Sequence, residues 1–215
     1  MRIDVIFDTI CPWCYIGKRR LERALAQRPE ISAEIRWRAF LLNPEMPASG
    51  VDRQTYLERK FGSAYRIQRI LGAASLAAEA ENIHFNFDLM ERTPSSINSH
   101  RLIHLASLSG CQSEVVESVF DAYFVQGLDI SDIDILCRLG ADCGLDPLEL
   151  RDYLLGAAGV AAIRTENAHI HRLGVSGIPC YFFNERYAVS GAQDVEILTR
   201  LLDIAREHEV ETAAA

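Results

Sequence analysis

The sequence predicts an α/β fold in which the two ends of the chain form one sheet and a large helical insertion lies between them. Strand-like alternation of apolar residues appears near the start, recurs at residues 33–42 and returns only after residue 177. Helical spacing joins the first two strands and then dominates the middle of the chain. We therefore expect a β-α-β half at 1–46, an all-helical insertion at 47–173 and a β-β-α half at 174–215.

Length and composition point to an ordinary globular protein. A chain of 215 residues suits one domain, or one domain carrying an insertion. Its 49% hydrophobic and 24% charged residues argue against disorder. The net charge of −8 argues against non-specific binding to nucleic acids or anionic membranes, which needs an excess of Lys and Arg. No apolar run approaches the length of about 18 residues that a membrane span requires.

The start of the chain and the use of cysteine predict a cytoplasmic protein. Met1 leads directly into the first strand, without the basic stretch and apolar segment of a secretory leader. Six cysteines are too few for a disulfide scaffold, so most are expected to be thiols in a reducing compartment. Four of them are scattered (Cys111, Cys137, Cys143 and Cys180), and the other two lie close together.

The N-terminal half is predicted to be a strand, a helix and a second strand. Residues 2–8 alternate, with Ile3, Val5 and Phe7 on one face. Residues 11–28 have helical spacing, and the proline that follows disfavours a helical residue before it. The second strand is expected at 33–42. A unit of this kind implies parallel strands and a right-handed crossover.

The insertion is predicted to consist of helices that are mostly separated by glycine residues acting as breakers and C-caps. The returning sheet is expected to be a hairpin with strands at 178–183 and 187–189, followed by an amphipathic helix at 193–208. The expected helices of the insertion are 52–60, 63–82, 95–109, 113–126, 131–143, 146–155 and 158–173.

The sequence Cys11-Pro12-Trp13-Cys14 directly follows the first strand and opens the first helix. Pro12 suits the first helical turn, where its missing N–H costs nothing. Two cysteines at this spacing can close a small disulfide ring without unfolding anything else. A Cys-x-x-Cys pair next to a β-α-β pattern is typical of a redox-active dithiol.

The helix phase gives the two cysteines different environments. Cys14 shares a face with Leu21 and Leu25, which is the expected buried face. Cys11 shares a face with Lys18 and Glu22, which is the expected solvent face. We therefore predict that Cys11 is the nucleophile and that Cys14 is the shielded resolving thiol.

The position of Cys11 at a helix start favours its thiolate form. Unpaired backbone N–H groups and the positive end of the helix dipole stabilise negative sulfur there. That stabilisation favours the dithiol over the disulfide, which makes the pair more oxidising. Trp13 adds bulk and no charge. The sequence therefore predicts a moderate oxidant or a reductant, and not an extreme oxidant.

The same motif has a structural alternative, as two buried thiols or as half of a zinc site. Zinc needs two further ligands, and no second module with suitable spacing accompanies this one. His100 and His104 are four residues apart on one helix face, but the glutamate of a zinc protease motif is missing. They are expected to be surface or core histidines, and no metal site is predicted.

Five stretches of the chain together resemble one known family. The stretches are FDTICPWCYIGKRR (7–20), WRAFLLNPEMP (37–47), HRLIHLA (100–106), GVSGIP (174–179) and YAVSGAQ (187–193). With them the chain resembles the DsbA family of the thioredoxin superfamily, and most closely its FrnE-like branch, over nearly the full length.

This resemblance implies a thioredoxin-like domain, formed by both ends of the chain and split by the helical insertion. It implies a cis bond between Ile178 and Pro179, in a loop that packs against the dithiol and pairs with an extended substrate chain. Pro12 and Trp13 would also contact substrate. The implied activity is that of a protein disulfide oxidoreductase. Cys11 would attack and Cys14 would resolve the mixed disulfide.

The resemblance also implies which cofactor, substrates and partners to expect. The redox-active disulfide of Cys11 and Cys14 would replace any bound cofactor. The substrate would be a thiol or disulfide, either a protein or a small molecule, with glutathione as a candidate co-substrate. A homodimer through the helical region is compatible with the sequence.

Departures from the family pattern include two in the returning hairpin. Cys180 follows Pro179 where relatives usually carry an aromatic or aliphatic residue. Strand alternation turns its side chain away from that of Pro179, so a packed thiol is expected more than a third redox sulfur. The hairpin turn carries Glu185 where glycine is common.

Two other functions remain open at this point. Glutathione-dependent enzymes of the 2-hydroxychromene-2-carboxylate isomerase and kappa-class transferase type share the inserted architecture, but typically carry serine at the position of Cys11. The presence of both cysteines favours disulfide exchange, because glutathione activation needs no second thiol. A non-enzymatic, chaperone-like module would use the same frame for recognition, and nothing in the insertion argues for it specifically.

Overall fold

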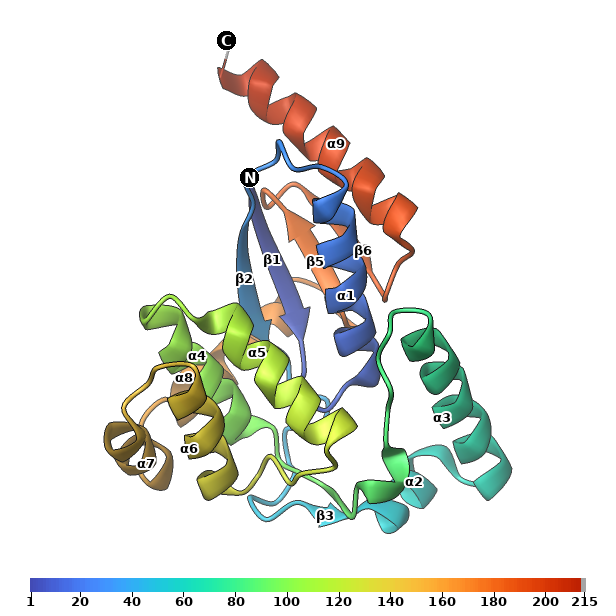
Figure 1. Cartoon of the computed structure of the whole chain (residues 1–215), viewed down its shortest axis with the longest axis vertical. Coiled ribbons are helices and arrows are strands. Elements are labelled where there is room, and N and C mark those ends of the chain that lie inside the picture. Colours follow the sequence, from blue (N-terminus) through green and yellow to red (C-terminus); the bar gives the residue numbers. More distant parts are fainter. Residues whose placement is uncertain (214–215) are drawn as a thin grey trace.

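The central sheet joins the two ends of the chain, with the strand order β2-β1-β5-β6 (Figure 1). The structure is a computed structural model that describes residues 1–213. β1 (Arg2–Phe7) pairs in parallel with β2 (Glu34–Ala39) and antiparallel with β5 (Cys180–Phe183), which forms a hairpin with β6 (Tyr187–Ser190). The β-α-β half and the returning hairpin are therefore confirmed.

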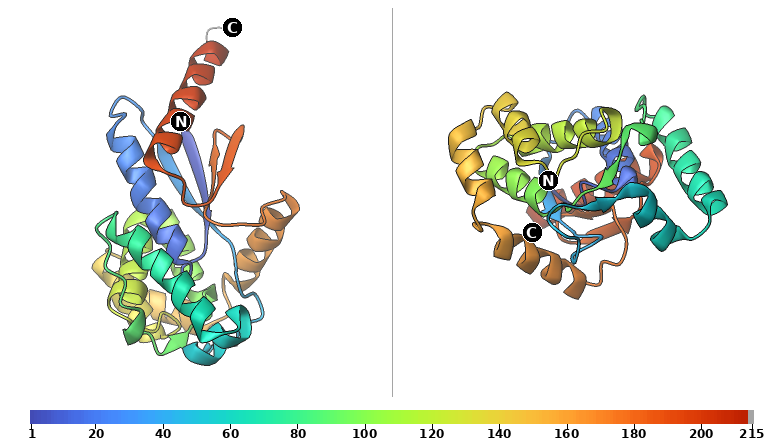
Figure 2. Two further views of the ribbon diagram at one scale, coloured as in Figure 1. Left: turned by 90° about the vertical axis from the view of Figure 1, so that its right-hand side faces the viewer. Right: turned by 90° about the horizontal axis from the view of Figure 1, so that it is seen from below.

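Each face of the sheet is covered by helices, and β1 presents apolar side chains to both. Val5 belongs to the cluster that α1 (Pro12–Ala26) and α9 (Val195–Ala213) cover. Ile6 belongs to a separate cluster with Ile170 of α8 (Val160–Arg172). Figure 2 shows α1 and α8 on opposite sides of the sheet (Figure 2). The continuous burial of β1 places its C-terminal end, and the start of α1, in the middle of the fold.

The insertion begins after β2 and divides into an arm and a body (Figure 1). The arm consists of α2 (Arg53–Phe61) and α3 (Ala64–Glu79). The body consists of α4 (Ile97–Leu108), α5 (Gln112–Phe120), α6 (Ile133–Asp142) and α7 (Pro147–Leu155), together with α8. A π-helical turn at Asp121–Val125 continues α5. All the expected helices are present, and the α/β fold with a helical insertion is confirmed.

Aromatic side chains fasten α5 of the body onto α1 and the sheet. The ring of Tyr15 on α1 stacks on Phe120 of α5, with 5.0 Å between the ring centroids. Phe7 at the end of β1 meets Phe120 edge-on at 5.9 Å and Trp37 of β2 at 5.0 Å. These contacts bury the helix that carries the Cys-Pro-Trp-Cys motif on its α5 side. None of the described helices is long and apolar enough to cross a membrane.

The insertion also contains a short ribbon that the sequence did not predict. β3 (Val51–Asp52) and β4 (Arg92–Thr93) pair antiparallel and link the start of the arm to the segment before α4. A two-residue strand is too short to show alternation.

β2 ends three residues earlier than predicted, because the backbone beyond it is bound by side chains. The N–H of Leu41 donates to Asn167 at 2.8 Å, and that of Leu42 donates to Asp8 at 2.7 Å. These side chains take the place of the neighbouring strand as hydrogen-bond partners.

The hairpin turn between β5 and β6 confirms that Glu185 occupies an unusual position. Asn184 and Glu185 have φ angles of 50° and 57°. Glycine adopts this left-handed region without a steric penalty, whereas a residue with a Cβ is disfavoured there. This is the physical reason that a glycine suits the turn.

Candidate active site

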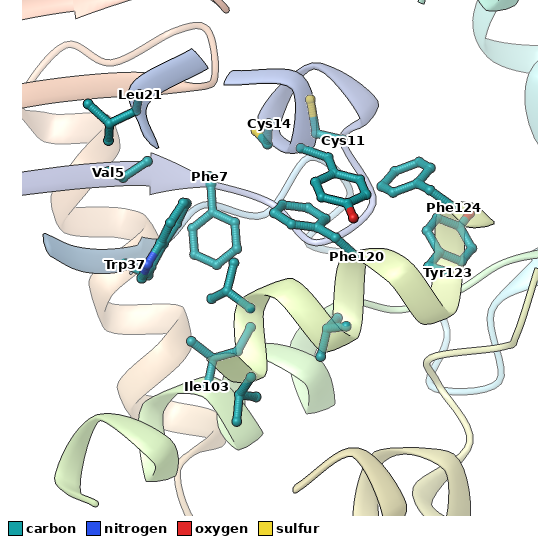
Figure 3. Close-up of a cluster of buried hydrophobic side chains, with 14 of the residues drawn as sticks. Val5, Phe7, Cys11, Cys14, Leu21, Trp37, Ile103, Phe120, Tyr123 and Phe124 are labelled. Carbon is teal, nitrogen blue, oxygen red and sulfur yellow. The ribbon is translucent and has the colours of Figure 1, made fainter. Parts of the chain in front are cut away.

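The two motif cysteines lie where β1 ends and α1 begins (Figure 3). Cys11 is the N-cap residue of α1 and has extended backbone angles, φ −97° and ψ 112°. Its N–H donates to the carbonyl of Asp8 at 3.0 Å, and its own carbonyl accepts the N–H of Cys14 at 3.0 Å. Pro12 occupies the first helical turn, as predicted. The Cys11 sulfur is therefore held at the electropositive end of the helix.

Both cysteines are free thiols and both are buried. Cys14 is 1% exposed, as its place on the apolar face predicted, but Cys11 is only 6% exposed. The expectation that Cys11 and Lys18 lie on a solvent face is therefore wrong. The Lys18 side chain is also buried and forms ion pairs with Glu117 of α5, at 2.6 Å, and with Glu22. Helical spacing cannot show that α5 covers this side of α1.

The environment of Cys14 favours its neutral thiol. Burial raises the pKa of Cys14 well above its ordinary value, and the hydrogen bond and charge of the adjacent Cys11 raise it further. A hydrogen bond from the backbone of Asp8 acts in the opposite direction. The two sulfurs lie side by side at the start of α1. The roles of nucleophile for Cys11 and resolving thiol for Cys14 stay predictions.

The Ile178–Pro179 peptide bond is cis, as the family resemblance implied. Pro179 is buried immediately before β5, whereas Ile178 is half-buried. The loop packs against α1 at Gly17, one turn after Cys14. A Cβ built on Gly17 would overlap the hydroxyl oxygen of Tyr181 and would lie 2.9 Å from Cγ of Pro179. The glycine therefore permits the close approach of β5 to the helix that carries the dithiol.

Replacing Gly17 with alanine is expected to destabilise the protein by about 2 kcal/mol, because Pro179 or Tyr181 must move. The added methyl also displaces the loop beside the dithiol, so the rate of disulfide exchange should fall. Urea unfolding and an exchange assay measure the two effects.

Gly72→Ala is the matched control, because Gly72 lies in the middle of α3 and a Cβ there meets no atom within 4 Å. That control should be stabilised by about 1 kcal/mol, and a Gly17→Ala protein as stable as this control would contradict the packing argument.

Cys11 opens into a cavity of about 240 Å³. Pro12 and Trp13 line the cavity with it, and the opposite walls come from α2, α3 and the aromatic residues near the end of α5. Ile178 and Pro179 are not among the lining residues. The predicted site is thus divided, with three of its residues at the cavity and the proline loop against α1. Four larger hollows, of about 820, 550, 480 and 400 Å³, are lined by neither motif cysteine.

A buried pair of titratable residues close to the dithiol was not recognised as part of the site from the sequence. Asp8 is fully buried, and its carboxylate lies 3.3 Å from Nε2 of His100, which is 2% exposed. Asp8 also accepts the backbone N–H of Leu42 at 2.7 Å, and its charge contributes to the raised pKa of Cys14. The available signal was an acidic residue that ends a buried strand three residues before Cys11. His100 is a core residue and His104 is exposed.

Cys180 lies on the opposite face of the sheet from the dithiol. It is 3% exposed and packs with Ile6 and Phe40 in the cluster that α8 covers. The Ser190 hydroxyl donates to its sulfur at 3.4 Å, and burial raises the pKa of the thiol. These contacts favour a packed thiol, as predicted from strand alternation.

Comparison with known proteins places these features in a family context. Residues 2–203 match the model of the DSBA-like thioredoxin domain. The crystal structure of the probable DsbA oxidoreductase of Streptomyces coelicolor has a TM-score of 0.87 and 30% sequence identity, over 96% of this chain and 90% of that chain.

Two further solved structures share the fold at lower identity. The cytosolic disulfide reductase DsbM from Pseudomonas aeruginosa with GSH has a TM-score of 0.67 and 18% identity, over the full length of both chains. A 2-hydroxychromene-2-carboxylate isomerase has a TM-score of 0.70 and 16% identity, over 99% of each chain. At these identities the likeness is one of fold.

Proposed function

Because the chain belongs to the DSBA-like thioredoxin domain family, we propose that it is a thiol–disulfide oxidoreductase that works through Cys11 and Cys14. One observation carries the proposal. Two free thiols lie side by side at the start of α1, one opening into a cavity and the other sealed beneath it. Disulfide exchange needs this combination of an accessible attacking sulfur and a shielded resolving sulfur.

The exchange would run in two steps. The Cys11 thiolate attacks one sulfur of a disulfide substrate, the substrate S–S bond breaks, and the first product leaves as a thiolate. The Cys14 thiol then loses its proton and attacks the Cys11 sulfur, which closes the Cys11–Cys14 disulfide and releases the second product thiolate. Two electrons pass to the substrate, and the protons lost by the two cysteines balance those that the two product thiolates gain. The reverse sequence oxidises a dithiol substrate.

The raised pKa of Cys14 supports this order of events. Burial and the neighbouring Cys11 keep Cys14 protonated while the substrate is captured. Once Cys11 is bound in a mixed disulfide, its charge no longer opposes ionisation of Cys14. The resolving step is then favoured over premature attack by Cys14.

Substrate would be held from two sides. Pro12 and Trp13 line the cavity at Cys11, where they would contact the group attached to the attacked sulfur. The half-buried Ile178 and the adjacent Pro179 would dock an extended chain through the backbone. Glutathione remains a candidate co-substrate and the cytoplasm the proposed location. The fold shared with a cytosolic reductase solved with GSH motivates a test of glutathione.

Mass spectrometry of the intact chain and its peptides tests the proposal. A mild oxidant should remove two hydrogens from the peptide that contains Cys11 and Cys14, and dithiothreitol should restore them. The oxidised protein should also pass its disulfide to a dithiol peptide. A chain in which no bridge forms between residues 11 and 14 under any oxidant would rule out the proposed exchange. It would leave the glutathione-dependent isomerase and the binding module as the remaining alternatives.

A further inference from the structure

The cavity beside Cys11 is large enough for one substituted aromatic ring. Its volume of about 240 Å³ exceeds the roughly 150 Å³ of an apolar cavity that accommodates benzene. It falls below the roughly 300 Å³ at which pockets for drug-sized ligands begin. A substituted aromatic or branched aliphatic group would fill it, whereas a length of polypeptide would not. The attacked sulfur would then lie at the wall formed by Cys11.

The lining is apolar over most of its surface. Leu57 and Phe124 are buried behind it, and the aromatic ring of Phe87 forms part of the wall. Ile70 of α3 also lines it and is 38% exposed. Polar groups that enter such a space lose their hydration without regaining all their hydrogen bonds. The lining therefore favours an apolar substrate body over a peptide-like one.

Two cations line the same cavity without an acidic partner. Within the described residues, neither Arg53 nor Lys60 has a carboxylate oxygen at ion-pair distance, although the chain carries a net charge of −8. The Arg53 guanidinium lies 5.4 Å from the ring centre of Phe87 and donates to the Tyr123 hydroxyl at 3.4 Å. The Lys60 ammonium lies 5.1 Å from the ring centre of Tyr56. Aromatic groups thus hold both cations, and neither cation forms an ion pair with a described carboxylate.

These observations identify a class of substrate for the dithiol. We propose that the cavity binds small thiols or disulfides that combine an apolar, preferably aromatic, body with a carboxylate. The body fills the space beside Cys11, and Arg53 and Lys60 attract the carboxylate. This inference rests on the proposed function, because the bound sulfur is exchanged with Cys11 by the two steps given above. Dithiol electrons reduce the substrate disulfide to two thiols.

Glutathione fits this site less well than an aromatic acid does. It carries carboxylates that the cations would attract, but its body is a polar peptide that would lose hydration against an apolar wall. The proposal therefore predicts two preferences. Anionic disulfides should react faster than uncharged ones, and among anionic disulfides those with an aromatic body should react faster than those with a polar body. The two preferences depend on different residues and can be measured separately.

Reaction of the reduced protein with three disulfides tests both preferences. Dithiobis(nitrobenzoate) is aromatic and anionic, dithiodipyridine is aromatic and uncharged at neutral pH, and glutathione disulfide is anionic and polar. Formation of the Cys11–Cys14 bridge is followed by acid quench and mass spectrometry, so that the other thiols do not contribute. Each rate is divided by that of the same disulfide with a free cysteine derivative. The aromatic acid should give the highest ratio.

The charge preference is tested with Arg53→Gln, Lys60→Gln and the double variant. A cation about 4 Å from the substrate carboxylate in a water-like medium stabilises it by about 1 kcal/mol, which is about fivefold in rate. The double variant loses two such cations, so it should react about twentyfold more slowly with dithiobis(nitrobenzoate). Its rate with dithiodipyridine should change by less than about twofold, which separates substrate binding from any effect of the cations on the Cys11 thiolate. Ile70→Glu, which adds a carboxylate to the lining and removes an apolar side chain from it, should slow dithiobis(nitrobenzoate) more than dithiodipyridine.

Arg69→Gln provides a matched control. Arg69 lies on α3, with its guanidinium 5.9 Å from the ring centre of Tyr65, and does not line the cavity. This variant should react like the wild type with all three disulfides. An equal loss with the charged and uncharged aromatic disulfides, or a higher ratio for glutathione disulfide than for the aromatic acid, would overturn the proposed substrate class. Absence of bridge formation with all three would instead remove the proposed function itself.

Discussion

Replacing Cys11 with serine is expected to lower the rate of disulfide exchange by about a thousandfold or more. A serine hydroxyl is almost entirely protonated at neutral pH and is a much weaker nucleophile than a thiolate at the same helix N-terminus. The small change in volume leaves the packing around α1 intact, so the variant should unfold near the wild-type urea concentration. Turnover of a disulfide substrate in the presence of dithiothreitol measures the loss.

Two further substitutions separate the roles of the thiols. Cys14→Ser should keep the first step and stop at the mixed disulfide, so a covalent adduct at Cys11 should accumulate. Cys180→Ser is the control for removal of a buried thiol, because Cys180 lies on the opposite face of the sheet. Its exchange rate should stay within about twofold of the wild type, even if the polar hydroxyl costs about 1 kcal/mol of stability. A large loss in Cys180→Ser with full activity in Cys11→Ser would reverse the assignment.

The second large effect is expected at Arg101, whose side chain is 1% exposed on α4. Its guanidinium donates to four backbone carbonyls at the end of α7 and in the turn that follows, those of Tyr153, Leu154, Gly156 and Ala158. Carbonyls at a helix C-terminus lack partners within the helix, and a cation there also opposes the negative end of the dipole. Arg101 therefore joins α4 to α7 and satisfies acceptors that would otherwise be buried and unpaired.

Arg101→Met should lower the free energy of unfolding by about 3 to 5 kcal/mol, because the aliphatic chain fills the space but leaves these carbonyls unpaired. In a domain of this size, such a loss lowers the melting temperature by about 10 °C. Differential scanning calorimetry measures the shift. Arg138→Met, at an exposed position on α6, should change stability by less than about 0.5 kcal/mol. Equal melting temperatures for the two variants would show that the buried contacts contribute no net stability.

Local patterns predicted most elements of the fold because those helices and strands are long enough to show their period. The apolar residues of a buried face recur with the period of the element. Examples are the alternation in β1, the helical spacing in α1 and the helices between β2 and β5. The motif at residues 11–14 predicted a redox pair because strand, turn and helix start are adjacent in the sequence. The two-residue strands β3 and β4 were missed because they are shorter than one period.

Contacts between distant segments account for what the sequence did not reveal about the site. The burial of Lys18 depends on Glu117, which lies on α5, and the burial of Cys11 depends on the arm that covers it. From the sequence, Arg101 resembles any polar residue on a helix. The residues next to it in the sequence do not indicate that its side chain contacts the end of α7. The same holds for Arg53, whose place beside Cys11 follows from the path of the chain between β3 and α2.

The cavity wall that faces the motif comes from a different stretch of the chain than the dithiol. The cysteines belong to the start of α1, whereas Arg53, Lys60 and Ile70 belong to α2 and α3. The reaction that such a protein performs and the molecules that it accepts can therefore diverge independently in evolution. A chimera that takes residues 53–71 from a homologue would inherit the donor's substrate preference and retain the redox chemistry of the recipient.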